Sequence, residues 1–216
     1  VRPEIVDPET TSIIITTNVK FDQNSANKTA DTIKSDVLTT LTNYNANTLS
    51  QFDGVFRYSK VTGLIDNTDS SILSNITTLK IRKDFTPTLT SSTKYNVYFR
   101  NSLHNPHSGH NSVAGGILES SGFKVSGDST SVFYLDDDGQ GNVRRYSFSG
   151  ATRVYTASNQ GTIDYDTGAI TINSLSVLSV ENIRGAASSK IELTVVPSSN
   201  DVVPVRDQIL EIDTAN

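Results

Sequence analysis

The N-terminal part of the chain switches between the two periodicities that distinguish strands from helices. Residues 12–21 are rich in β-branched side chains, and every second position from Ile15 to Phe21 alternates with a polar one, which predicts a strand with one buried face. Residues 27–44 place apolar side chains at steps of three and four, which predicts an amphipathic helix. These positions are Ala30, Ile33, Val37, Leu41 and Tyr44. We expect this apolar stripe to pack against a sheet.

A second helix and a second strand are predicted next. Residues 51–65 show a shorter helical pattern, and residues 74–85 interleave apolar with charged side chains, as in a strand with a charged outer face. The order strand, helix, helix, strand predicts a compact α/β unit. Its two strands could run parallel or antiparallel, because the helices could form a crossover or a returning hairpin.

After Pro87 the pattern changes to short alternating strands separated by turns. The predicted strands are residues 94–100, 115–125, 131–135, 142–148 and 188–196. Residues 136–141 (DDDGQG) and the Asp166–Gly168 turn are rich in residues that tolerate positive φ, so they predict hairpin connections. We therefore expect this region to be mainly antiparallel.

Together the two patterns predict an α+β protein, with an α/β unit that contains two helices, a region of antiparallel β-hairpins and an extended C-terminal tail. The expected boundaries are a linker at residues 1–10, the α/β unit at 11–90, the β region at 91–200 and the tail at 201–216. As an alternative, residues 105–180 could form an insertion into the first sheet.

The predicted tail carries apolar side chains that have no place in the other predicted elements. We interpret them as an interface, because apolar surface of this kind needs a partner in this domain or on another chain. The interface residues predicted in this way are Val202, Val203, Val205, Ile209, Leu210 and Ile212.

Composition and charge exclude several classes of function. The 216 residues include no Cys, Met or Trp, which excludes disulfides, thiolate metal sites and thiol catalysis. The net charge is -5 and no basic face is visible, so we predict no nucleic-acid partner. No apolar run approaches the length of a membrane span, so we predict no membrane partner. A chain that begins at Val1 and lacks Met is what we expect of a piece of a longer polypeptide.

Three equally spaced histidines, His104, His107 and His110, are the best metal candidate in the chain. Imidazoles must converge on one ion to bind it, whereas the Pro and Gly residues within this segment place it in a loop of unspecified shape. No carboxylate follows until Glu119. We therefore favour a turn with local hydrogen bonds over a metal site.

Residues 136–141 resemble a calcium-binding loop, because Asp136, Asp138 and Gln140 alternate and Gly141 stands at the sixth position. The twelfth position, where a bidentate Glu belongs, is Ser147, and the flanking segments are predicted strands rather than helices. We favour a solvated hairpin tip. The sequence thus predicts no metal and no cofactor.

The chain contains no recognisable catalytic motif. Gly-x-Ser-x-Gly and the P-loop are absent, and paired carboxylates such as Asp164 and Asp166 occur in turns that give no cause for a raised pKa. We predict that the protein is not an enzyme. A hydrolase that uses Asp or His residues between 104 and 138 is an alternative, and it requires a cleft in which these side chains converge.

Several segments, in their order along the chain, resemble a known family. They are IIITTNVKF, SANKTADTIKSDVLTTLTNY, FDGVFRYSKVTGLID, NSLHNPHSGH, GGILESSGF, GTIDYDTGAITI and VVPVRDQILEID. They are similar to the C-terminal part of the large wedge protein, gene product six, in the baseplate of T-even-type contractile-tailed phages, a family related to the J-type baseplate proteins. The likeness extends from about Ser12 to Asp213 and includes no catalytic signature.

This resemblance implies a structural role in the virion. Wedge subunits of the family dimerise through their C-terminal domains, join neighbouring wedges into a ring around the central hub and contact other wedge proteins. The expected partners are therefore a second copy of this chain, in a homodimer, and other baseplate wedge proteins. The expected location is the phage tail baseplate, assembled in the host cytoplasm. The resemblance implies no enzymatic activity and no cofactor.

A carbohydrate-binding or adhesin-like β module is the alternative function, because surfaces rich in Ser, Thr, Asn and Tyr suit polar ligands. This alternative predicts an aromatic platform on one face. Trp is absent, however, and the 8 Tyr residues are scattered along the predicted strands. We therefore rank it below the baseplate role.

Overall fold

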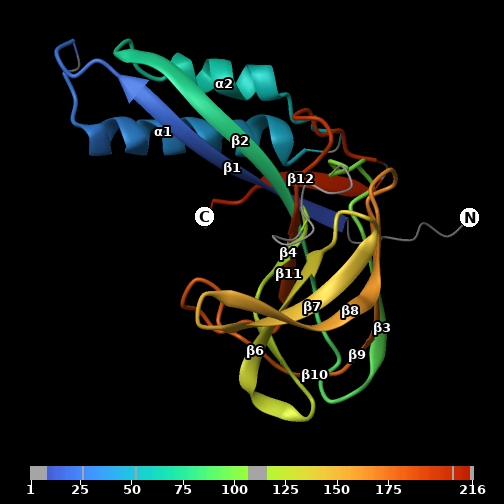
Figure 1. Ribbon diagram of the computed structural model, residues 1–216. Helices are drawn as coiled ribbons and strands as arrows, with labels where there is room; N and C mark the ends of the chain where they lie inside the picture. Colours follow the sequence, from blue (N-terminus) through green and yellow to red (C-terminus); the bar gives the residue numbers. More distant parts are fainter. Residues whose placement is uncertain (1–8, 26, 52, 107–115, 206, 215–216) are drawn as a thin grey trace, which may run out of the picture. The chain divides into compact units, whose positions relative to one another are not determined.

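The computed structural model describes residues 9–25, 27–51, 53–106, 116–205 and 207–214 and divides the chain into two units (Figure 1). The first unit is formed by Val1–Ile81 and Ser199–Asn216, and the second by Arg82–Ser198. No helix within the described ranges is long and apolar enough to cross a membrane.

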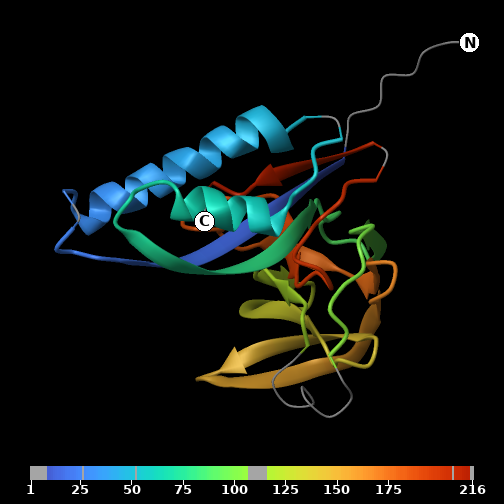
Figure 2. The same cartoon turned by 90° about the horizontal axis from the view of Figure 1, so that it is seen from above.

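The first unit combines strands with two α-helices and a short π-helical turn. Its elements are β1 (Glu9–Phe21), α1 (Ala30–Tyr44), η1 (Asn45–Leu49), α2 (Tyr58–Asp66), β2 (Ile72–Phe85) and β12 (Gln208–Ile212). Figure 2 shows α1 and α2 together on one face of β1 and β2. β2 continues past Ile81 into the second unit.

The predicted amphipathic helix is confirmed by α1. The hydroxyl of Thr29 accepts a hydrogen bond from the N–H of Thr32 at 3.3 Å and so caps the start of the helix. The buried side chains recur at the predicted steps and are Ile33, Val37, Leu41 and Tyr44. Because burying one such side chain stabilises a fold by about 1.5–3 kcal/mol, this stripe holds α1 on the sheet.

The second helix is shorter than its periodicity predicted. It begins at Tyr58 rather than near Gln51, because the intervening chain passes close to the preceding turn. A Cβ atom at Gly54 would stand 2.1 Å from the Leu49 carbonyl oxygen, so a larger residue does not fit there. Phe56 then forms an antiparallel bridge with Val202, and this bridge ties the C-terminal segment to the first unit.

β1 and β2 run antiparallel, a direction that the sequence left open. Asp22 N–H donates to the Ser71 carbonyl at 2.9 Å. Further back along β1, the hydroxyl of Thr17 lies 2.9 Å from that of Thr77. Partners therefore ascend along β2 as they descend along β1, so the two helices form a returning hairpin rather than a crossover.

The second unit is built from strands. They are β3 (Thr93–Tyr98), β4 (Glu119–Ser120), β5 (Phe123–Val125), β6 (Asp128–Asp137), β7 (Asn142–Ser149), β8 (Thr152–Asp164), β9 (Ala169–Leu175), β10 (Val177–Val180) and β11 (Ile191–Val195). The predicted hairpins are confirmed, because β6 pairs antiparallel with β7 and β8 pairs antiparallel with β9.

A curled seven-stranded sheet, of order β10-β5-β6-β7-β8-β9-β3, encloses the core of the second unit. Its two ends are linked, because Leu89, just before β3, bridges to Val177 in β10, and Thr90 N–H donates to the Val177 carbonyl at 2.7 Å. Fully buried side chains fill the core and include Phe99, Phe123, Leu135, Ile170 and Ile172.

The predicted α+β fold class is wrong. The structure is mostly β, with 50% strand and 15% helix, and its second sheet has the order β12-β1-β2-β11-β4. Helical periodicity is confined to two short segments, whereas strands occupy most of the remaining chain. The C-terminal segment is also not a tail: residues 208–212 form β12, which pairs in parallel with β1. A local pattern does not reveal such a pairing, because the two strands lie at opposite ends of the chain.

Candidate functional site

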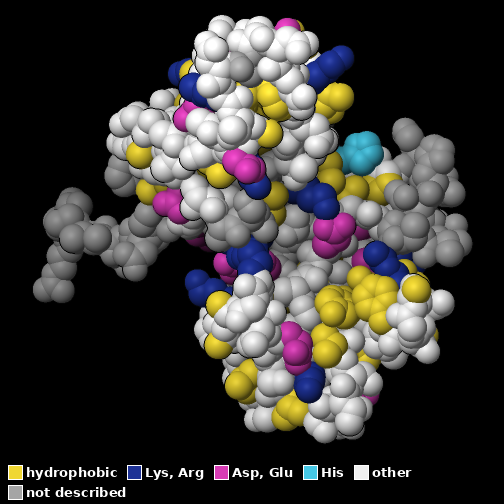
Figure 3. Space-filling view, turned by 90° about the vertical axis from the view of Figure 1, so that its left-hand side faces the viewer, with side chains coloured by type: hydrophobic (Ala, Val, Ile, Leu, Met, Phe, Trp, Pro, Cys, Tyr) yellow, Lys and Arg dark blue, Asp and Glu magenta, His cyan; other side chains and the backbone are white. Residues whose placement is uncertain are grey.

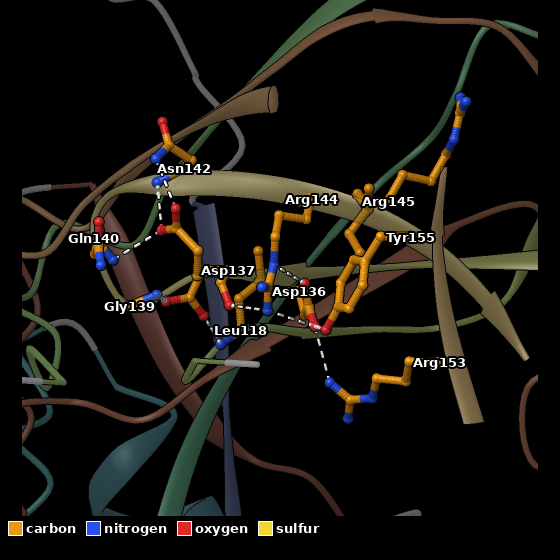
Figure 4. A network of polar contacts seen from close by, with 12 residues as sticks. Leu118, Asp136, Asp137, Gly139, Gln140, Asn142, Arg144, Arg145, Arg153 and Tyr155 are labelled. Carbon is orange, nitrogen blue, oxygen red and sulfur yellow. Dashed lines mark hydrogen bonds and ion pairs between the residues drawn. The ribbon is translucent and has the colours of Figure 1, made fainter. Parts of the chain in front are cut away.

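A dense polar cluster lies at the β6–β7 hairpin, where the sequence resembles a calcium loop (Figure 4). Three consecutive aspartates, Asp136, Asp137 and Asp138, supply its carboxylates. Side chains alternate along a strand, so Asp136 and Asp137 point to opposite faces of β6. Each carboxylate therefore has its own set of partners, and each is considered in turn.

Asp136 is buried among two arginines and a tyrosine. Arg144, its cross-strand neighbour, donates from Nε at 3.0 Å and from Nη2 at 3.2 Å. Arg153 and Tyr155 of β8 each donate to Oδ2 at 2.8 Å. Burial, followed by the hydrogen bond to Asp136, raises the pKa of the Tyr155 hydroxyl. Both carboxylate oxygens are thus engaged by protein donors, as a buried charge requires.

Asp137 is fully buried and is held by neutral donors. Its Oδ1 accepts the N–H of Leu118 at 2.7 Å, and its Oδ2 accepts the hydroxyl of Tyr165 at 2.5 Å and the N–H of Gly139 at 3.2 Å. Burial, together with the bond to Asp137, raises the pKa of the Tyr165 hydroxyl. A Cβ atom at Gly116 would stand 1.9 Å from Oδ2, so the backbone itself covers this carboxylate.

Asp138 shapes the hairpin turn. It accepts the N–H of Gln140 at 2.8 Å, the N–H of Asn142 at 3.0 Å and the Asn142 side-chain amide at 2.7 Å. Burial favours a higher pKa for Asp138, but the bonds from Asn142 and Gln140 outweigh it and lower the pKa. Gly139 and Gly141 supply the positive φ angles of 76° and 98° that this turn needs. The aspartates therefore build the hairpin rather than a calcium site.

The predicted histidine loop is described only at His104. The His104 side chain is exposed, and its backbone N–H donates to the Val196 carbonyl at 2.9 Å. His107 and His110 lie outside the described residues. Among the residues that the structure does describe, no group of three His, Asp or Glu side chains could hold a metal ion.

A hollow of about 390 Å³ lies beside the tips of the two predicted hairpins, lined in part by Gln140, Asp164, Tyr165 and Asp166. Asp164 is engaged in its own turn, where it accepts the Thr167 hydroxyl at 2.7 Å and the Asp166 N–H at 2.9 Å. These bonds, with that of the Thr167 hydroxyl the strongest influence, lower the pKa of Asp164. A general acid needs the opposite shift, so the hollow does not favour the hydrolase alternative.

The structure gathers aromatic residues that look scattered along the sequence. Tyr134, Tyr146 and Phe148 have ring centroids 5.4–5.6 Å apart, and Tyr155 lies 5.7 Å from Tyr146. The Arg153 guanidinium lies 4.7 Å from the centroid of the Tyr146 ring. Figure 3 shows hydrophobic side chains gathered on the surface of the second unit. We call Tyr134, Tyr146, Phe148, Tyr155 and Arg153 the aromatic ladder.

The predicted interface residues separate into two groups. Val202, Leu210 and Ile212 are buried in the first unit, and Ile209 is half-buried. Val203 and Val205 are 49% and 39% exposed. The exposed pair is available to a partner, whereas the buried residues anchor the segment that carries it.

Sequence reasoning missed the partners of Asp136 and the aromatic ladder. The hairpin turn itself offered a signal, because a turn at residues 138–141 sets Asp136 opposite Arg144 across the two strands. The alternation of Arg144, Tyr146 and Phe148 along one strand places all three on one face. The positions of Arg153 and Tyr155 could not be predicted in this way, because the pairing of β8 with β7 contains shifts in register.

The comparison with known proteins found a match that lies almost entirely in the first unit. Residues 9–84 match the family described as baseplate structural protein gp6, C-terminal domain III. The matched segment begins with β1 and contains both α-helices and β2 up to its penultimate residue. No curated protein matches the chain. Over residues 9–84, the match confirms the resemblance to gp6-like baseplate structural proteins that was seen in the sequence segments.

Proposed function

We propose that the chain is a structural component of the baseplate of a contractile-tailed phage and that it self-associates as a wedge domain. In this role it links neighbouring wedges into a ring around the hub and contacts other baseplate wedge proteins. Its location is the virion, after assembly in the host cytoplasm. The proposal includes no catalysis, no cofactor, and no nucleic-acid or membrane partner.

The observation that carries this proposal is the match of residues 9–84 to a baseplate structural protein. The geometry of the polar cluster supports it, because Asp136, Asp137 and Asp138 are bound by protein donors. Buried carboxylates that are satisfied in this way stabilise a hairpin and leave little capacity for a substrate.

Within this proposal, the C-terminal segment contributes to the contact between subunits. Val203 and Val205 contact the partner, because they are exposed apolar side chains next to a buried anchor. The anchor is the bridge between Val202 and Phe56, which is reinforced by Asp201, whose carboxylate accepts the N–H of Tyr58 at 2.8 Å. A rigidly held pair of apolar side chains loses little conformational entropy on binding.

Sedimentation velocity of the purified chain tests self-association. We expect a dimer at high micromolar concentration, and a strictly monomeric species would contradict the proposal. Replacing both Val203 and Val205 with Ser should raise the dissociation constant by about tenfold or more, since each loses buried apolar area. The matched control is Leu89→Ser, which removes a side chain of similar exposure, 51%, from the second unit.

The carbohydrate-binding alternative keeps one specific observation in its favour, the aromatic ladder. Its exposed member, Phe148, is 49% exposed, and Arg153 beside it could donate to a sugar hydroxyl. A glycan array with the intact chain tests this function. Binding that is lost in Phe148→Ala and kept in Tyr98→Ala, a control of equal exposure on β3, would support it.

A further inference from the structure

The outer part of β1 has a free edge. β12 pairs with β1 only from Glu9 to Ile13, and Asp213 N–H ends this pairing with a bond of 2.8 Å to the Ile13 carbonyl. β1 continues to Phe21, well past the end of β12 (Figure 1). In the described part of the chain, β2 is the only strand that flanks β1 beyond Ile13.

The direction of the backbone groups identifies which residues this edge presents. Both groups of a residue in an antiparallel ladder, the N–H and the C=O, point to the same side, and the side alternates from one residue to the next. Glu9 N–H bonds on the β12 side, whereas Asp22 N–H bonds to Ser71 on the β2 side. Odd-numbered residues of β1 therefore face the β12 side. Every second residue from Ile15 to Phe21 is left with both groups at the free edge.

A half-exposed leucine on α1 lies on the same side. Leu38 and Asn45 are seven residues apart, so they share one line along the helix. Asn45 Oδ1 accepts the N–H of Ile212 in β12 at 2.7 Å, which places this line on the β12 side of the sheet. The other flank of α1 faces the end of α2, because the hydroxyl of Thr68, two residues after α2, lies 3.2 Å from the hydroxyl of Thr40. Leu38 is 50% exposed, and its place on the line of Asn45 puts it on the side of β1 that carries the free edge.

We propose that the free edge of β1 pairs with the same edge of a second copy, in an antiparallel register centred on Asn18. This inference rests on the self-association proposed above and adds a second contact surface to the one that carries Val203 and Val205. In this register Ile15 faces Phe21 of the other copy and Thr17 faces Val19, so every free N–H meets a free C=O. An interface of this kind is closed by a two-fold axis and needs no third subunit.

Side chains favour this register over its neighbours. Lys20 lies opposite Thr16 of the other copy, whereas a register centred on Lys20 would set two positive charges against each other. On the face covered by the helices, Ile15 and Phe21 are both half-buried, and their contact would bury them further. The two Leu38 side chains lie on this same face and exclude water from the new strand pair.

The residues of the free edge indicate which strand pairs with it. Sheets protect exposed edges with proline, with charge or by covering them. The segment from Ile15 to Phe21 contains no proline and a single charged residue, Lys20. An edge that is unprotected and complementary to itself is suited to a copy of the same strand.

Cysteine cross-linking in the intact chain tests the register directly, because the protein has no native cysteine. Residues opposite each other in a non-hydrogen-bonded antiparallel pair have Cα atoms about 4.5 Å apart, within the range of roughly 4.4–6.8 Å that a disulfide needs. Asn18→Cys places a thiol on the two-fold axis. The matched controls are Thr16→Cys and Lys20→Cys, which are exposed on the same face of β1.

We expect Asn18→Cys to form a covalent dimer under mild oxidation, several-fold faster than either control. Faster cross-linking through Thr16→Cys or Lys20→Cys would overturn the register. A wild-type dimer in which none of the three cross-links would overturn this inference and leave the proposed self-association standing. A wild-type chain that stays monomeric would remove both.

A variant of Leu38 supplies a second measurement. Leu38→Lys should weaken dimerisation by tenfold or more without changing the melting temperature, because the side chain is half exposed and places a charge against its copy. Leu73→Lys, at a 62% exposed position of β2, is the control and should leave the dissociation constant unchanged. Equal effects of the two substitutions on the dissociation constant would show that Leu38 does not lie in the interface.

Discussion

The two units differ in how they treat the edges of their sheets. In the second unit, the bridge between Leu89 and Val177 links the two ends of the curled sheet. In the first unit, β1 extends past β12, and among the residues that the structure describes no strand pairs with this edge from Ile15 to Phe21. Closed edges suit a self-contained module, whereas an open edge recruits another strand. The family match, over residues 9–84, falls almost entirely in the first unit.

The units also differ in where they keep their charges. The second unit buries Asp136 with Arg144 inside a satisfied network. The first unit keeps ion pairs such as Lys28 with Asp36 at the surface, where each contributes little. We therefore expect the loss of Asp136 to destabilise the protein more than the loss of the Lys28–Asp36 ion pair.

Truncating one core aromatic in each unit should have the largest effect and tests whether the units are independently stable. Phe56 in the first unit and Phe99 in the second are both 0% exposed. Replacing a buried Phe with Ala costs about 3–5 kcal/mol. We expect each variant to lose hydrogen-exchange protection in its own unit, as measured by mass spectrometry. If either variant exposes both units equally, they unfold as one block and the contrast between them fails.

Removing the buried carboxylate of the second unit should have the next largest effect. Asp136→Ala leaves Arg144 buried without its partner, and breaking a buried ion pair costs about 3 kcal/mol or more. We expect a lower urea midpoint, followed by near-UV circular dichroism of the tyrosines. The control is Asp166→Ala at an exposed position of the same unit, which should change stability by less than about 0.5 kcal/mol. Equal losses in the two variants would mean that the network is not a stabilising element.

Two glycines should respond to the same substitution with opposite signs. Gly116→Ala sets a Cβ atom 1.9 Å from Asp137 Oδ2, and overpacking of this kind costs about 1–3 kcal/mol. Gly63 lies inside α2 with nothing within 4 Å of its Cβ position, so Gly63→Ala should stabilise the first unit by up to about 1 kcal/mol. Thermal melts of both variants measure the difference. Destabilisation by Gly63→Ala would contradict the open space around it.

Elements with a long, unbroken period could be predicted from the sequence. Residues 12–21 and 27–44 gave β1 and α1, because α1 buries one stripe along its length and every second residue of β1 from Thr11 to Phe21 is buried or half-buried. The β6–β7 hairpin followed from residues 136–141, whose glycines tolerate the φ angles of the turn. Each of these elements is determined by residues within it, so its sequence pattern predicts it.

The remaining features depend on contacts between distant residues. The parallel pairing of β12 with β1 joins Gln208 to Glu9, and no local pattern encodes it. The same is true of Arg153, which reaches Asp136 from a third strand. Phe56, which the sequence placed in a helix from Gln51, instead bridges to Val202 near the other end of the chain. Periodicity shows which face is buried but not what buries it, which is why the fold class was wrong.

The smallest predicted effect is an acid-sensitive contact of the first unit, at Asp69. The backbone N–H of Ser71 at 2.9 Å, its hydroxyl at 2.7 Å and then Lys28 at 3.2 Å lower the pKa of Asp69 from 3.8 to about 2. A lowered pKa means that the folded state favours the carboxylate, so this stabilisation is present above pH 3.8 and is lost as the pH falls toward 2.

Asp69→Asn should therefore be less stable than the wild type at pH 7 and equal to it near pH 2, in urea midpoints measured across this range. Because Lys28, one of its partners, is exposed, the difference should be small and should shrink further in high salt. Ser70→Ala, at the exposed position next to Asp69, removes no titratable group and is the control, so its difference from the wild type should not vary with pH. If the difference in stability between Asp69→Asn and the wild type stayed constant from pH 7 to pH 2, its cause would be lost packing rather than lost charge. The ion pair of Asp69 with Lys28 would then not stabilise the first unit.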